Sequence, residues 1–324
     1  MDIYAAILAG GRSKRMNSTI SKVLHPLLGK PLVFFPLKVA CSLRPAGIFV
    51  IVSPDTHQEV AARVREMFPD EPIEFVVQPE PRGTGDAVMQ LAPYFKDKDV
   101  DLLVMPGDAP LLREDTAKLM YRFHKENDAR ITILTAEVPD PTGYGRIVRS
   151  HGDRVLMIVE EKDAFPEEKE IREINSGIYL FRTGDLFSFL PEIKPQNAQG
   201  EYYLTDVIEI VQRKRGGVLA FKIADWKETL GVNTRPQLIQ AQKILKQRLV
   251  DRWIREGVSF IDPDLVYLEY DVVLEKDATI YPFVSLIGQT HVGRGATVGP
   301  GVKLVNARVP DGAVLGFESG GDHG

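Results

Sequence analysis

Two adjacent glycines followed by a run of cations near the N-terminus suggest a phosphate-binding loop. Gly10 and Gly11 come directly after an apolar run at 4–9, which is typical of a buried strand. Adjacent glycines can take positive φ and bring amide N–H groups against an anion, while guanidinium and ammonium groups neutralise its charge. The cations that follow are Arg12, Lys14, Arg15 and Lys22. The pattern is neither G-x-G-x-x-G nor G-x-x-x-x-G-K-[ST], which argues against a Rossmann dehydrogenase and a P-loop NTPase. The alternative to a phosphate-binding loop, which stays open here, is an ordinary β-to-α turn on a basic surface.

Asp108 is a second candidate for chemistry, because it follows the apolar run at 102–105 within a turn shaped by Pro106 and Gly107. In isolation, an aspartate at such a place could equally cap the next helix. Asn233 has the same alternative, since alone it would be interpreted as a helix N-cap. Glu160, followed by another glutamate, could belong to a solvated acidic face.

Strand and helix patterns alternate over the first half of the chain, and these elements must position the candidate residues. Apolar runs bounded by Pro, Gly or Asp predict strands at 4–9, 48–52, 73–77 and 102–105. Apolar residues at helical spacing predict helices at 31–43, 56–67, 86–95 and 114–127. The repetition indicates an α/β fold with a mostly parallel, doubly wound sheet and helices on both faces. Ligands of such sheets bind beyond the carboxyl ends of the strands, where Gly10–Gly11 and Asp108 both fall.

The second half of the chain has a different texture. More strands and longer loops are predicted from 130 to 225, with strands at 131–138, 145–149, 155–160 and 177–181, the last three of a kind that walls a substrate pocket. A long amphipathic helix is predicted at 235–256. Beyond it, apolar positions recur every sixth residue from Val266 to Val302, and a second series follows from Leu268 to Leu304. Seven unbroken hexads predict a β-helix rather than an ordinary sheet, because stacking buries what each short strand cannot bury alone.

Composition excludes several classes of protein. With 324 residues and 44% apolar content, the chain can form a substantial core and two domains. No apolar run is long enough to span a membrane and no signal peptide is evident, so we expect a cytoplasmic protein without a membrane partner. A net charge of -5 argues against nucleic-acid binding. The single cysteine, Cys41, lies in an apolar context that favours a buried small side chain over a nucleophile.

Several motifs together resemble the sugar-1-phosphate nucleotidyltransferases, and most closely the uridyltransferase part of the bifunctional N-acetylglucosamine-1-phosphate uridyltransferase/glucosamine-1-phosphate acetyltransferases. The N-terminal loop is similar to the family pattern L-A-[AG]-G-x-G-T-R-M, with Leu8, Ala9, Gly10 and Gly11 at its start and a lysine, Lys22, after it. Ser13 and Lys14 replace the glycine and threonine of the pattern. The resemblance implies that Arg15 and Lys22 are catalytic, with Arg15 on the pyrophosphate side and Lys22 at the transferring phosphoryl group.

The resemblance also implies a metal and a nucleotide site. Asp108 matches the family aspartate that binds Mg²⁺ and contacts the nucleotide, and Asn233, in Gly231-Val232-Asn233, matches the second ligand. One carboxylate and one carbonyl oxygen suit Mg²⁺ when phosphates and water complete its octahedron. Gln78 and Gly83 would bind uracil, since a glutamine amide offers both a donor and an acceptor, and Thr84 would support them. Asp86 stands where close family members often have histidine.

The sugar site is implied by three further motifs. Gly145, Glu160 and Asn175 match the family residues that bind N-acetylglucosamine, and Asn233 lies at the same end. The segment 197–206 is nearly identical to that of the acetylglucosamine enzymes, which separates the chain from glucose-1-phosphate thymidylyltransferases. Pro106 occupies a place where some members have tyrosine.

The activity implied is Mg²⁺-dependent transfer of UMP from UTP to N-acetylglucosamine-1-phosphate, giving UDP-N-acetylglucosamine and pyrophosphate. The implied domains are a nucleotidyltransferase domain at 1–233, a linking helix at 234–257, a left-handed β-helix of little more than two turns at 258–316 and a tail at 317–324. Association into a homotrimer through the β-helix is expected, and no acetyltransferase activity, since the repeats fade after Leu304. Another sugar 1-phosphate as substrate, or a non-catalytic homologue that senses nucleotide sugars, stays open as the alternative.

Overall fold

The computed structural model describes residues 2–11 and 14–316, which divide into two compact units. The first unit comprises Met1–His25 and Pro31–Gln237, and the second Pro26–Lys30 and Leu238–Gly324. The tail at 317–324 and two residues of the phosphate loop, Arg12 and Ser13, lie outside the described residues. Within the described ranges, none of the helices combines the length and the apolar character that a membrane span requires.

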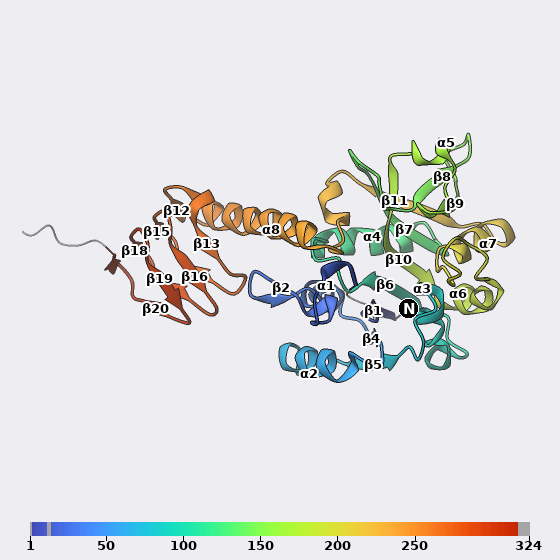
Figure 1. The fold of residues 1–324 in the computed structure, drawn as a ribbon, viewed down its shortest axis with the longest axis horizontal. Helices are drawn as coiled ribbons and strands as arrows, with labels where there is room; N and C mark the ends of the chain where they lie inside the picture. Colours follow the sequence, from blue (N-terminus) through green and yellow to red (C-terminus); the bar gives the residue numbers. More distant parts are fainter. Residues whose placement is uncertain (1, 12–13, 317–324) are drawn as a thin grey trace, which may run out of the picture. The chain divides into compact units, whose positions relative to one another are not determined.

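A nine-stranded sheet in the order β11-β7-β10-β6-β1-β4-β5 forms the first unit, with β8 and β9 added beside β10 (Figure 1). The run β5-β4-β1-β6 is parallel, as is the pair β7-β11, whereas β10 is antiparallel to both β6 and β7. The predicted α/β fold with a mostly parallel sheet is therefore confirmed. The strands are β1 (Ile3–Leu8), β4 (Gly47–Val52), β5 (Ile73–Val77), β6 (Asp101–Pro106), β7 (Ile131–Glu137), β8 (Arg146–Arg149), β9 (Val155–Val159), β10 (Glu173–Arg182) and β11 (Val218–Ile223).

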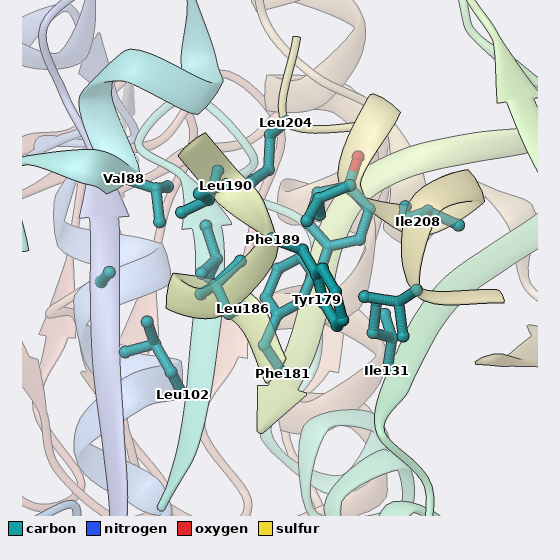
Figure 2. Packing of buried hydrophobic residues seen from close by; sticks show 14 of the residues in the cluster. Val88, Leu102, Ile131, Tyr179, Phe181, Leu186, Phe189, Leu190, Leu204 and Ile208 are labelled. Atoms are coloured by element: carbon teal, nitrogen blue, oxygen red, sulfur yellow. The ribbon is translucent and has the colours of Figure 1, made fainter. Parts of the chain in front are cut away.

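Both faces of the sheet are covered, because successive side chains of a strand point to opposite faces. In β4, Phe49 and Ile51 belong to one apolar cluster, while Ile48 and Val50 belong to the other. Figure 2 shows the first cluster, in which Leu186 and Ile208 come from covering helices. The helices of this unit are α1 (Phe34–Ser42), α2 (His57–Met67), α3 (Thr84–Met89), α4 (Glu114–Glu126), α5 (Pro166–Lys169), α6 (Thr183–Phe189) and α7 (Asp206–Lys214), with short 3-10 turns η1 (Lys14–Met16), η2 (Lys22–Leu24), η3 (Ala92–Phe95), η4 (Leu190–Glu192) and η5 (Trp226–Thr229).

Two predictions for this unit were wrong in detail. The helix predicted at 86–95 begins earlier, at Thr84, and breaks after Met89, because Pro93 has no N–H to donate to the Met89 carbonyl four residues earlier. The region 130–225 was interpreted as strands and loops, yet it contains α6 and α7. The apolar residues of both helices pack on the same sheet as the strands. Each helix is short, so its helical spacing of apolar residues is difficult to distinguish in the sequence from the neighbouring loops.

The helix α8 (Arg235–Arg255) has the predicted bounds within one residue, and the second unit contains this helix from Leu238 on together with a parallel β-helix. Three ladders of short strands, β12-β15-β18-β21, β13-β16-β19 and β14-β17-β20, stack with parallel pairing. The hairpin strand β2 (Pro26–Leu27), which pairs with β3 (Lys30–Pro31), also belongs here: the Leu28 carbonyl accepts a hydrogen bond from the Tyr270 amide at 2.9 Å. The strands are β12 (Ser259–Phe260), β13 (Tyr267–Leu268), β14 (Val273–Leu274), β15 (Thr279–Ile280), β16 (Ser285–Ile287), β17 (His291–Val292), β18 (Thr297–Val298), β19 (Lys303–Val305), β20 (Arg308–Val309) and β21 (Val314–Leu315). The 3-10 turn η6 (Pro263–Leu265) lies between β12 and β13 in the chain.

The β-helix is longer than the predicted two turns and a little more. It begins at β12, before the first hexad, and continues past Leu304 through β20 and β21. Tyr267 pairs with Ser285, 18 residues on, but His291 pairs with Arg308, 17 residues on. Loss of one residue from the last repeat breaks the six-residue period in the sequence while the stacking continues. Thr290, the polar member of the inward series, is fully buried, and its hydroxyl donates to the Ile287 carbonyl at 2.7 Å.

Candidate active site

A cavity of about 660 Å³ lies in the first unit, beyond the carboxyl ends of β1, β5 and β6. This is where the parallel sheet predicts a ligand. Of the residues to which the sequence assigned a catalytic, nucleotide-binding, sugar-binding or metal-binding role, Ala9 and Arg15 are not part of the lining. Those that line it are Leu8, Gly10, Gly11, Lys22, Gln78, Gly83, Thr84, Asp108, Gly145, Glu160, Asn175 and Asn233.

The glycine loop lines the cavity, but neither Gly10 nor Gly11 has the positive φ that was predicted. A Cβ on Gly10 would lie 3.4 Å from the Ser53 nitrogen and 3.5 Å from Gln78 Oε1, which are ordinary van der Waals contacts. Ala9 is buried, and its amide donates to the Ile51 carbonyl at 2.7 Å, which anchors the start of the loop.

Four polar side chains from distant parts of the sequence converge at one end of the cavity. The Lys22 ammonium forms an ion pair with the Asp108 carboxylate and donates to Asn233 Oδ1 at 3.2 Å. Arg15 donates to the same Asn233 oxygen at 2.8 Å. Lys22 and Asp108 side chains are only 15% and 12% exposed, so their charges interact in partial isolation from water. The cluster thus combines two cations with a carboxylate and an amide oxygen.

The backbone explains why Asp108 and Asn233 meet. The Val232 amide donates to the Asp108 carbonyl at 2.8 Å, which holds the segment Gly231-Val232-Asn233 against the turn after β6. Neither side chain caps a helix: α4 begins at Glu114 with Arg113 as its N-cap, and at the start of α8 the Thr234 hydroxyl accepts from the Gln237 amide at 3.4 Å. The capping alternatives for Asp108 and Asn233 are therefore excluded.

The donor set of this cluster suits a hard divalent cation. Asp108 and Asn233 direct oxygens at one positively charged group, the Lys22 ammonium. Carboxylate and carbonyl oxygens are ligands that Mg²⁺ accepts in small number when substrate phosphates supply the rest. No group of three or more His, Cys, Asp or Glu that could hold a metal ion occurs in the part of the chain that the structure describes. One carboxylate and one amide oxygen fit a metal ion whose other ligands come from substrate phosphates and water.

The loop after β5 forms another wall of the cavity. Gly83 has a φ of 115°, and a Cβ there would lie 2.5 Å from the Tyr202 carbonyl oxygen, so only glycine fits. The Thr84 hydroxyl accepts from the Leu204 amide at 3.1 Å, and the Gly85 amide donates to the Tyr202 carbonyl at 2.8 Å. These bonds join the loop to the segment 197–206, so two motifs that the sequence singled out separately support one wall.

Gln78 does not offer the donor that was predicted for it. The side chain is 7% exposed, and its amide nitrogen donates to the Gly83 carbonyl at 3.1 Å and to Asp86 Oδ2 at 2.8 Å. A carboxamide nitrogen has two hydrogens, and both are directed at these protein oxygens. The side chain is left with an acceptor, Oε1.

The residues matched to sugar binding also lie together. The Asn175 amide donates to the Gly145 carbonyl at 2.9 Å, and a Cβ on Gly145 would lie 3.3 Å from Glu160 Oε2. The Asn175 side chain donates to the Tyr179 hydroxyl at 2.7 Å. Burial raises the pKa of Glu160 despite a hydrogen bond from Thr205, so this carboxylate belongs to a cavity wall and not to a solvated acidic face.

Thr205 and Tyr144 are among the lining residues to which the sequence assigned no role. Thr205 donates to Glu160 Oε1 at 3.3 Å, and its position inside the segment 197–206 was the available signal. Tyr144 lines the cavity beside Gly145; burial raises the pKa of its phenol, and a hydrogen bond with the Gly231 backbone opposes that rise. Tyr144 thereby connects the loop that carries Gly145 to the segment that carries Asn233.

A mostly parallel sheet with Lys22, Arg15, Asp108 and Asn233 clustered near its carboxyl edge is an arrangement that a nucleotidyltransferase requires. The nucleotidyl transferase family model matches residues 4–245, and the chain belongs to this family. A crystal structure in complex with sucrose, of a Bacillus anthracis protein assigned as a glucose-1-phosphate thymidylyltransferase, superposes with a TM-score of 0.62 at 21% identity, covering 75% of this chain and 94% of that chain. This likeness shows the fold.

Within the family, the chain is similar to bifunctional GlmU proteins, which confirms the resemblance seen in the motifs. It is 42% identical to the GlmU of Brevibacillus brevis over 97% of this chain and 67% of that protein. It is 43% identical to the GlmU of Acetivibrio thermocellus over 95% of this chain and 66% of that protein. The chain thus spans about two thirds of the length of these curated relatives.

Proposed function

We propose that this protein transfers UMP from UTP to N-acetylglucosamine-1-phosphate, giving UDP-N-acetylglucosamine and pyrophosphate. The observation that carries the proposal is that one cavity is lined by Lys22, Asp108 and Asn233, by the Gln78–Gly83 loop and by Gly145, Glu160 and Asn175, with Arg15 bonded to Asn233. Groups suited to phosphates, a base and a sugar thus share one cavity.

Positioning and charge stabilisation account for the chemistry. A phosphate oxygen of the sugar phosphate is already a nucleophile, so it attacks the α-phosphorus of UTP in line without a general base, and pyrophosphate leaves. Lys22 stabilises negative charge on the transferring phosphoryl group, and Arg15 stabilises it on the pyrophosphate. Their partners Asp108 and Asn233 hold both cations at the cavity before substrate binds.

Asp108 and Asn233 are the residues that would hold Mg²⁺. When bound with substrate, the ion supplies charge neutralisation between phosphate groups. The Lys22 ammonium is bonded to the same two oxygens, so this cation is held beside the residues that would bind the ion.

The sugar would lie against Gly145, Glu160 and Asn175. The ionised Glu160 is an acceptor for sugar hydroxyls, and Thr205 holds its other oxygen in place. Asn175 is oriented by Tyr179 and by the Gly177 amide, which donates to Asn175 Oδ1 at 3.1 Å. This pre-formed wall lowers the ordering cost of binding.

The proposal is tested by a panel that crosses UTP, dTTP and CTP with several sugar 1-phosphates, with and without Mg²⁺, and follows pyrophosphate release. We expect the highest kcat/KM for UTP with N-acetylglucosamine-1-phosphate and no turnover without the metal. A higher kcat/KM with glucosamine- or N-acetylgalactosamine-1-phosphate would replace the proposed sugar. Absence of turnover with every pair, together with tight binding of UDP-N-acetylglucosamine, would indicate a sensor and refute the enzyme.

A further inference from the structure

The Gln78 carboxamide is held in one orientation by two oxygens, one on Asp86 and one on Gly83. Its nitrogen faces Asp86 Oδ2 at 2.8 Å and the Gly83 carbonyl at 3.1 Å. If the group were turned over, Oε1 would face two other oxygens, one of them negatively charged, and no hydrogen would lie between them. Electrostatics therefore selects the orientation in which Oε1 points away from Asp86.

The orientation determines what the base would meet. Gln78 lines the cavity beside Gly10, and its Oε1 lies 3.5 Å from the place of a Cβ on Gly10. An oxygen there accepts a hydrogen bond and cannot donate one. Uracil and thymine have an N–H at position 3, whereas cytosine has an acceptor at that position and would face the same oxygen with a lone pair.

Asp86 is itself oriented by a third residue. Its other oxygen, Oδ1, accepts from Arg82 Nη2 at 3.0 Å, and the side chain of Asp86 is 9% exposed while that of Arg82 is 56% exposed. Neither Asp86 nor Arg82 is among the residues that line the cavity. Arg82, Asp86 and Gln78 thus form a relay that runs from the surface to the wall of the cavity.

We propose that Asp86 is a positioning residue for nucleotide choice: by holding the Gln78 nitrogen, it presents Oε1 to the base and favours bases with an N–H at position 3 over cytosine. This inference rests on the proposed function for the identity of the nucleotide site. Asp86 acts through Gln78 and does not touch the base.

Asparagine at position 86 gives the sharpest test, because it has one oxygen for two donors. Arg82 is charged and takes that oxygen, so the asparagine nitrogen faces Gln78 and turns its carboxamide over. We expect Asp86→Asn to lower the ratio of kcat/KM for UTP over CTP about tenfold or more, by the cost of one unpaired buried group. Removing Arg82 as well frees the oxygen to face Gln78, so Arg82→Ala/Asp86→Asn should recover most of the ratio.

Matched variants separate orientation from damage to the fold. Arg82→Ala alone keeps the bond between Asp86 and Gln78 and should leave the ratio unchanged. Asp153→Asn makes the same chemical change in an exposed ion pair with Arg149 and should also leave it unchanged. Asp86→Ala removes the acceptor without adding a donor, so the ratio should fall by less than in Asp86→Asn; it is also the variant to use if Asp86→Asn does not fold.

A ratio for Asp86→Asn within twofold of the parent, or a double variant no better than the single one, would overturn the inference. Failure of the proposed function has a different signature, which is absence of pyrophosphate release from UTP and N-acetylglucosamine-1-phosphate by the parent protein. Dissociation constants for UTP and CTP, measured calorimetrically on the same variants, would then give the ratio without turnover. The same ordering of variants supports the role of Asp86, and equal ratios refute it.

Discussion

Removal of the charge on Asp108 tests the centre of the proposed site. Asp108→Asn keeps the shape of the side chain and one oxygen but removes the carboxylate that pairs with the Lys22 ammonium. Asn233→Ala removes the amide oxygen that accepts from Arg15 at 2.8 Å and from Lys22 at 3.2 Å. Both variants leave the backbone bond between Val232 and Asp108 in place, so the segments should still meet.

The magnitude follows from the number of charged partners. A hydrogen bond to a charged group contributes about 1.5–3 kcal/mol, so loss of the Asn233 oxygen should lower kcat about 10- to 100-fold. Asp108 supplies the carboxylate of the cluster, and its side chain and that of Lys22 are 12% and 15% exposed. Loss of the Asp108 charge should therefore lower kcat about 100-fold or more.

The assay is pyrophosphate release at saturating UTP and N-acetylglucosamine-1-phosphate over a titration of Mg²⁺. We expect both variants to need more Mg²⁺ for half-maximal rate and to keep the parent melting temperature within a few degrees. Asp115→Asn, an exposed aspartate in the first turn of α4, is the control and should behave as the parent. Near-normal kcat in Asp108→Asn and Asn233→Ala at ordinary Mg²⁺ concentration would refute the assignment of the metal and phosphate cluster.

Three further outcomes are expected. Burial raises the pKa of Glu160 above the ordinary value of 4.5, so KM for the sugar phosphate should rise as the pH falls and this carboxylate is protonated. Glu160→Gln should have a higher KM at pH 8, and its KM should not depend on pH once the titration of the substrate phosphate is subtracted. An identical pH profile of KM in the variant and the parent would contradict the role of Glu160. Burial alone would raise the pKa of Asp101, but the His124 ring, 3.4 Å away, and the Lys125 ammonium, which donates to Asp101 Oδ2 at 2.7 Å, outweigh it and lower the pKa from 3.8 to about 2. The stabilisation by Asp101 is therefore present above pH 3.8 and is lost toward pH 2. Urea unfolding of Asp101→Asn should show a loss of about 2 kcal/mol at pH 7 and a smaller loss at pH 3, and equal losses would argue against the ion pairs. The β-helix carries exposed apolar side chains at Val273, Val305 and Val314, so we expect light scattering at micromolar concentration to give the mass of a homotrimer, and a monomer mass would refute association.

The sequence by itself determined the elements whose burial pattern is local. The strand at 73–77 could be predicted because it is a short apolar run with prolines close to both ends, and the inward series from Val266 because apolar residues recur every sixth position. Motifs at strand ends could be assigned to one edge of the sheet because the carboxyl ends of parallel strands lie at the same edge. Family resemblance then supplied roles for Lys22, Asp108 and Gln78 that composition and spacing do not contain.

Tertiary structure decided which of those residues meet and in what state. Asp108 and Asn233 are brought together by a backbone bond between segments far apart in the sequence, and no local pattern records it. The strand pairs of β20 and β21 persist although the hexad period is lost, because stacking depends on hydrogen bonds to the previous turn and tolerates a shorter loop. The donor expected of Gln78 is consumed by Asp86, since a buried amide satisfies both hydrogens from whichever oxygens lie nearest in space.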